Sequence, residues 1–225
     1  MNFTTHFPGA KIYKLETNYR SVPAVLHTAN RIFRSKPKEL RKVLHSGMYS
    51  LGEARRYPKP SKSHFNTQED MVIWIQSQLS EVQKRHTIPP CKTALLFRVN
   101  QTLEWTREQF ETSGIEEENF PVFSTIHGAK GLEFPVVFLC DLEEGVFPNY
   151  RLRKSQRIRN WNDVFRRYIL RKKPPPIECD IDEETRLFYV GVTRAEKILY
   201  LLSCAQKYEH GRRKKYEGSR FLRLV

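Results

Sequence analysis

Apolar positions recur along the chain in two periods, one typical of amphipathic helices and one of buried strands. Helical spacing predicts four helices. They cover residues 22–33, 67–85, 101–114 and 181–195. Thr67 and Asp70 form a sequence typical of a capping box at the start of the second helix, and Gly114 is expected to stop the third.

Short apolar runs predict strands between these helices. They lie within residues 11–20, 92–99, 120–126, 135–142 and 197–205, the last being the final expected strand. Residues 35–66 are rich in Lys, Pro and Ser and are expected to be mostly loop. Alternating strands and helices indicate an α/β fold, with a mostly parallel sheet covered by helices on both faces.

The charge balance points to a polyanionic partner. The 225 residues include 39 Lys and Arg against 25 Asp and Glu, a net charge of +14. Residues 151–173 hold ten Lys or Arg and one acid, so this segment carries +9 and the remainder 14 − 9 = +5. Ile158, Trp161, Phe165 and Tyr168 fall near one helical face of it. Two interpretations stay open: a surface that tracks phosphates or binds a protein, and a solvated helix packed on the domain.

Several classes of protein are disfavoured. Cys91, Cys140, Cys179 and Cys204 are far apart and form no CxxC pair, which argues against a zinc site or a disulfide framework. No apolar run reaches the roughly 18 residues of a membrane span, and the N-terminus has no signal-peptide pattern. We therefore expect a cytoplasmic, nucleoid-associated protein without a membrane partner.

The stretch "FSTIHGAKGLEFPVVFLCDLEEGVFP" (123–148) has the Gly and Lys of a phosphate-binding turn. The chain nevertheless contains no G-x-x-x-x-G-K-[ST] loop. The run "VVFLCDLEE" (136–144) is similar to a Walker B strand, but without that loop we interpret it as a structural strand with a capped end.

Four segments resemble the motifs of one protein family, and they follow one another along the chain in the order of those motifs. They are "LETNYRSVPAVLHTAN" (15–30), "FSTIHGAKGLEF" (123–134), "EEGVFP" (143–148) and "EETRLFYVGVTRA" (183–195). This set resembles motifs IV, V and VI of the UvrD/Rep-type superfamily 1 helicases. "LLFRVNQTLE" (95–104) resembles that family's element in contact with single-stranded DNA, and "GSRFL" (218–222) its closing segment.

The resemblance implies a single domain over residues 1–225, the second RecA-like motor domain, lacking its own P-loop. On the same resemblance, the first RecA-like domain and the usual accessory insertion are expected to be absent, and a basic insertion is expected at about 149–178. It implies the C-terminal motor half of an ATP-dependent, single-strand-translocating DNA helicase of repair or replication. The implied partners are single-stranded DNA and an N-terminal RecA-like domain. That domain would mainly hold the Mg²⁺ of ATP, so the chain alone is not expected to hydrolyse ATP.

The same resemblance assigns roles to nucleotide-site residues. Arg20 and Arg194 would be catalytic arginines that reach the γ-phosphate, Tyr19 would stack on the adenine, and Glu133 would bond the ribose hydroxyls. Arginine suits this role because its charge is permanent and its fork planar.

A second set is assigned to DNA. It comprises Arg98, Asn100, Thr125, His127 and Lys130. A core position for His127 and a turn-capping role for Lys130 stay open as alternatives. Two other functions also stay open for the chain: a nucleic-acid-binding remnant without ATPase activity, and a protein-interaction module that uses the basic segment.

Overall fold

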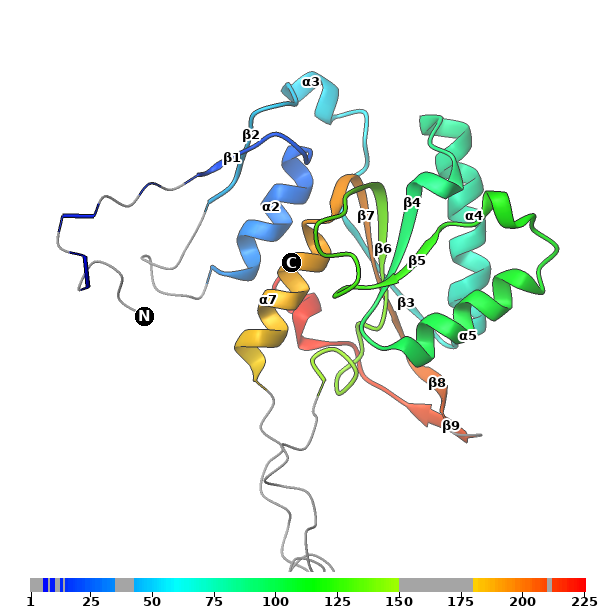
Figure 1. Ribbon diagram of the computed structural model, residues 1–225. Helices are drawn as coiled ribbons and strands as arrows, with labels where there is room; N and C mark the ends of the chain where they lie inside the picture. The colour runs from blue at the N-terminus through cyan, green and yellow to red at the C-terminus, as the bar shows by residue number, and fades with distance from the viewer. Residues whose placement is uncertain are drawn as a thin grey trace, which may run out of the picture.

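A five-stranded, all-parallel sheet forms the centre of the molecule (Figure 1). The computed structural model describes residues 15–34, 43–149, 180–209 and 212–225, together with residues 6, 7, 9, 10 and 13. The strands, in spatial order, are β3 (Ser61–Phe65), β7 (Ala195–Cys204), β6 (Phe134–Leu139), β4 (Thr93–Phe97) and β5 (Val122–Thr125). Every neighbouring pair is parallel, which confirms the predicted sheet.

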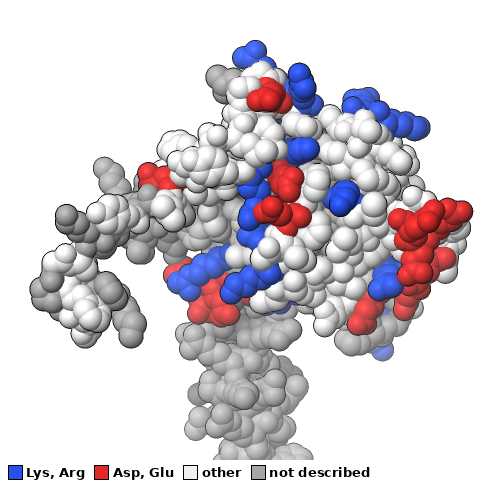
Figure 2. Space-filling model, turned by 45° about the horizontal axis from the view of Figure 1, so that its top comes forward, with Lys and Arg blue, Asp and Glu red and all other residues white. Residues whose placement is uncertain are grey.

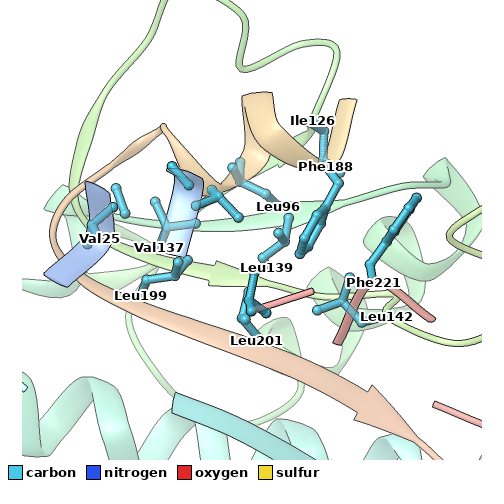
Figure 3. Packing of buried hydrophobic residues seen from close by; sticks show 14 of the residues in the cluster. Val25, Leu96, Ile126, Val137, Leu139, Leu142, Phe188, Leu199, Leu201 and Phe221 are labelled. Atoms are coloured by element: carbon cyan, nitrogen blue, oxygen red, sulfur yellow. The ribbon is translucent and has the colours of Figure 1, made fainter. Parts of the chain in front are cut away.

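Helices cover both faces of this sheet, as predicted (Figure 1). On one face lie α2 (Pro23–Ile32) and α7 (Ile181–Val192). Their apolar sides meet the strands in one buried cluster, and Figure 3 shows Val25 and Phe188 packed with Leu96 and Val137. On the other face, α4 (Gln68–His86) and α5 (Asn100–Glu111) bury Ile75 and Phe110 in a second cluster.

Local sequence signals place the helix ends close to where they were predicted. The Thr67 hydroxyl accepts from the Asp70 amide at 3.1 Å and the Asp70 carboxylate accepts from the Thr67 amide at 3.1 Å, which confirms the capping box. Helix α5 ends at Glu111, and Gly114 follows in the turn with φ +74°.

Sequence reasoning missed several short elements. The segment 35–66, expected to be mostly loop, contains β2 (His45–Ser46), α3 (Leu51–Ala54) and the edge strand β3 among its described residues. A hairpin of β8 (Gln206–Glu209) and β9 (Arg212–Lys215) follows β7, the last strongly apolar strand. The β3 residues "SKSHF" and the β9 residues "RRKK" are mostly polar, so apolar periodicity could not find them. An edge strand does not need the continuous apolar run of a central strand.

The N-terminal strand was only partly predicted. Among the described residues of 11–20, strand β1 covers Thr17–Asn18, and it pairs with β2 outside the central sheet. The basic segment 151–173 and its apolar stripe lie outside the described residues. None of the helices in the described part of the chain has the length and apolar character of a membrane span.

Candidate functional site

The turn that leads into α2 carries the first arginine of the site. The Asn18 side-chain oxygen accepts from the amides of Arg20 (2.9 Å) and Ser21 (2.7 Å), which closes the turn. The Ser21 hydroxyl donates to the Ala195 carbonyl at 2.8 Å, and the Val22 amide donates to the Glu196 carbonyl at 2.8 Å. The turn is therefore fixed against the first residues of β7.

Glu133 meets this turn from the segment before β6. Its carboxylate forms an ion pair with the Arg20 guanidinium, and both side chains remain partly open to solvent. The next amide, that of Phe134, donates to the Arg194 carbonyl at 3.0 Å. Glu133 thus lies between the two arginines that the sequence singled out.

Arg194 follows the C-terminus of α7, and its guanidinium is fixed by backbone oxygens. Nε donates to the Val190 carbonyl at 3.0 Å and Nη1 to the Leu132 carbonyl at 2.9 Å. Burial lowers the pKa of Arg194, the nearby charge of Arg20 lowers it further, and Glu133 opposes both. Three segments distant in sequence therefore place Arg20, Glu133 and Arg194 together, at the amino ends of β6 and β7.

Glu196 also belongs to this cluster, and sequence reasoning missed it. Burial raises the pKa of the Glu196 carboxyl, and the charge of Glu133 adds to that rise. The available signal was its position two residues after Arg194 in the same motif. Figure 2, which turns this end of the molecule toward the viewer, shows basic and acidic side chains alternating across it.

Tyr19 presents its ring to solvent beside the cluster. It is 72% exposed, and its ring passes Gly47 so closely that an added Cβ there would lie 2.8 Å from Cε1 of Tyr19. The Gly47 amide donates to the Asn18 carbonyl at 2.8 Å. Gly47, which sequence reasoning also missed, therefore allows the tyrosine ring to lie close to the backbone just after β2.

The turn after β5 joins the two ends of the sheet, because it begins at the carboxyl end of β5 and ends at the amino end of β6. The Thr125 hydroxyl accepts from the Gly128 amide at 3.0 Å, so Thr125 stabilises the turn. An added Cβ on Gly128 would lie 2.9 Å from the Ser124 hydroxyl, so a larger residue there would displace that hydroxyl. His127 and Lys130 are exposed on this turn, which removes the core interpretation of His127.

Arg98 and Asn100 lie at the carboxyl end of β4 but differ in their surroundings. Asn100 is exposed at the first position of α5. The Arg98 guanidinium is largely buried and donates to both oxygens of Glu184, at 3.0 and 2.7 Å. Glu184 was not predicted from the sequence, and it gives Arg98 a structural partner within the chain.

The acids after β6 form a buried ionic cluster. Asp141 accepts from the Arg98 and Val99 amides at 2.9 and 3.2 Å, and its carboxylate pairs with Lys207 of β8 at 2.6 Å. Glu143 pairs with Lys207 at 2.5 Å and accepts from the Cys204 amide at 2.6 Å. These contacts fit the interpretation of "VVFLCDLEE" as a structural strand.

The two carboxylates share one buried ammonium, that of Lys207. Burial raises the pKa of Glu143 to about 7, and Asp141 adds to the rise while Lys207 opposes it. Burial alone would lower the pKa of Lys207, but Asp141 and Glu143 outweigh it and raise that pKa. The described residues contain no group of three His, Cys, Asp or Glu that could hold a metal ion.

The chain belongs to the UvrD-like helicase C-terminal domain family, whose model matches residues 13–123 and 118–206. It is 30% identical to a probable DNA helicase of Mycoplasma pneumoniae over 223 residues, 97% of this chain and 36% of that protein. It is 42% identical to the ATP-dependent DNA helicase PcrA of Bacillus subtilis over 98 residues, 44% of this chain and 10% of that protein. The chain therefore spans much less than the length of these relatives.

A solved structure is also similar, that of the C-terminal domain of a possible DNA helicase from Lactobacillus plantarum. The TM-score is 0.49 and the sequence identity 16%, over 83% of this chain and 88% of the other.

Proposed function

We propose that this chain is the second motor domain of a DNA helicase and completes an ATP site whose P-loop lies on a first motor domain. The observation that carries the proposal is the meeting of Arg20, Glu133 and Arg194, from three separate segments, at one end of the sheet. The family to which the chain belongs supports the same function.

In this proposal, Arg194 and Arg20 stabilise the charge that spreads over the transferred phosphoryl group. The backbone bonds from Arg194 to Val190 and Leu132 fix its guanidinium before any ligand arrives, as electrostatic stabilisation of a transition state requires. The Mg²⁺ of ATP would be held mainly by the first domain, and it would neutralise charge on the phosphates.

Tyr19 and Glu133 would position the rest of the nucleotide. The exposed ring of Tyr19 offers a face on which the adenine can stack. Glu133 would accept from the ribose hydroxyls. Because Glu133 pairs with Arg20 in this structure, the proposal includes an exchange in which nucleotide binding releases Arg20 toward the phosphates.

Single-stranded DNA would bind at the other end of the sheet, where Asn100 and His127 are exposed. Arg98 would act there by fixing the loop between β4 and α5 through Glu184. The turn 126–133 runs from this end to the arginine cluster, so a change in one site can reach the other through it. Closure of the cleft on ATP would then change the grip on DNA.

The test joins this chain to the P-loop motor domain of a UvrD-like helicase and measures ATP hydrolysis with and without single-stranded DNA. We expect the joined protein to show DNA-stimulated hydrolysis and the 225-residue chain alone to show none. The control is Arg107→Ala in the joined protein, which changes an exposed arginine of α5 and should leave hydrolysis unaltered. Hydrolysis by the chain alone, or none by the joined protein while DNA binding persists, would overturn the proposal.

A further inference from the structure

A groove of about 710 Å³ lies beside α4, and Tyr57 in its wall packs against the buried clusters on both faces of the sheet. Its walls come from the chain after α3, the first residue of β3, α4 between Trp74 and His86, and Tyr200 of β7. The residues that matter most for its chemistry are Arg55, Arg56, Tyr57, Trp74, Arg85 and His86.

The groove is cationic. Arg55 and Arg56 are both largely open to solvent, and neither forms an ion pair in the described part of the chain. Arg85 pairs with Glu81 one turn earlier on α4, and Glu81 is the one acid that lines the groove. Two adjacent arginines that are not held in ion pairs are suited to an anionic ligand.

Aromatic side chains lie directly beside these charges. The Tyr57 ring lies 5.5 Å from the His86 ring at an interplanar angle of 33°, and Lys197 Nζ lies 5.5 Å from the Tyr57 centroid. Trp74 is only partly buried and meets Tyr200 edge-on at 5.4 Å. The groove therefore combines cations with partly exposed rings, the combination that binds phosphates and stacks bases.

We infer that this groove binds single-stranded nucleic acid, as a second strand site separate from the strand path proposed at Asn100 and His127. The two places lie at different ends of the sheet: His86 ends α4 beside the amino ends of the strands, whereas Asn100 follows the carboxyl end of β4. An acidic peptide would satisfy the arginines but would leave the rings without partners. A single strand uses both features, and needs no sequence preference to do so.

Binding of fluorescent oligothymidylate to the 225-residue chain, titrated at several salt concentrations, tests the role of the arginines. An oligomer of roughly 16 nucleotides suits a single-strand groove. Arg55→Ala/Arg56→Ala removes two cations that would neutralise phosphates, so the slope of log K against log salt should become shallower by about 1.4. The charge-matched control is Arg107→Ala/Arg186→Ala, at exposed positions of α5 and α7. Equal slopes for the two double variants would overturn the proposal.

Crosslinking locates the strand without disturbing the fold. An oligomer containing iododeoxyuridine, irradiated on the native chain, should couple to Tyr57, Trp74 or His86, as mapped by mass spectrometry. Unlabelled oligothymidylate should abolish these crosslinks, and an abasic oligomer of equal length should compete less well, because stacking contributes to binding. Crosslinks confined to the β5–β6 turn or to α5, or equal competition by the abasic oligomer, would contradict the proposal.

The inference stands independently of the proposed ATP site. Asn100→Ala/His127→Ala should remove binding at the first strand path and leave the crosslinks in the groove. If those crosslinks disappear in this variant, the groove is not a separate site. Failure of ATP hydrolysis in the joined protein would affect the proposed function alone.

Discussion

Both oxygens of Glu184 accept from the guanidinium of Arg98, at 3.0 and 2.7 Å, and this pair joins the end of β4 to the first turn of α7. The same carboxylate accepts from the Asn149 amide at 2.9 Å. Because Arg194 follows the last turn of α7, one helix connects the carboxyl end of the sheet, where we propose DNA binding, to the amino end, where we propose nucleotide binding. A rigid element between two sites is one physical means of coupling them.

Glu184→Ala should strongly destabilise the chain. It leaves the Arg98 guanidinium largely buried without its counter-charge, which costs about 3 kcal/mol of the free energy of unfolding. Urea denaturation measures the loss. Arg98→Ala/Glu184→Ala should lose less than the two single variants combined, because the partners form one unit. Glu111→Ala, which breaks the exposed pair with Arg107, is the control and should cost about 0.5 kcal/mol or less. A similar cost for both glutamates would contradict the role of Glu184.

Arg194→Ala should abolish most ATP hydrolysis in the protein that joins both motor domains. An arginine that acts on the transition state lowers kcat by about a thousandfold when removed, whereas nucleotide binding changes little. Steady-state kinetics and nucleotide binding give the two quantities. Arg194→Lys keeps the charge but loses the fork, so it should recover only part of kcat. Turnover within about threefold of the native protein would show that Arg194 has another role.

Glu143→Gln should flatten the dependence of stability on pH. The pKa of Glu143 is about 7 in the folded chain, above the ordinary value of 4.5, because of burial and the charge of Asp141. Between these values the folded chain holds a proton that the unfolded chain has released. The free energy of unfolding therefore falls as pH rises through this range, by about 3 kcal/mol. Denaturation at about pH 5 and about pH 8 should show this fall in the native chain and a smaller one in the variant. If the free energy of unfolding falls equally in the native chain and in Glu143→Gln, the titrating group is not Glu143.

Local signals were sufficient to predict the central elements of the fold. The capping box at Thr67 and the helical spacing of apolar residues lie within a few positions of one another, so they are visible in sequence. The central strands β4 and β6 are almost wholly buried and form apolar runs in the sequence. Strand β3 lies at an edge of the sheet, and most of its residues are polar. It becomes recognisable as a strand only through its pairing with β7, which is distant in the chain.

The candidate site depended on tertiary contacts that no spacing encodes. Arg20 and Glu133 meet only because the turn before α2 is fixed to the start of β7, beside β6. The resemblance to a helicase family supplied Arg20, Glu133 and Arg194, but it did not supply Glu196, Glu184 or Gly47. Those residues contact other side chains of the chain itself: Glu196 lies near Glu133, Glu184 binds Arg98, and Gly47 lies against Tyr19. Their roles are therefore visible only once the fold has brought these partners together.

The basic segment 151–173 lies outside the described residues, and its role can be separated from that of Asn100 and His127 by charge. The variant neutralises Arg166, Arg167, Arg171, Lys172 and Lys173 together. If these residues bind DNA phosphates, each cation removed from a phosphate should reduce the slope of log K against log salt by about 0.7 for a single strand, because fewer counterions are released. Titration of oligothymidylate at several salt concentrations measures the slope.

Asn100→Ala/His127→Ala provides the matched comparison. It removes at most one charge and should therefore weaken binding at every salt concentration with little change in slope. A five-residue variant that keeps the native slope would assign the basic segment to a protein partner or a solvated helix. DNA binding would then be confined to the exposed residues at the carboxyl end of the sheet and to the groove beside α4. A shallower slope in the five-residue variant would instead extend the strand path along the segment, since counterion release follows the number of neutralised phosphates.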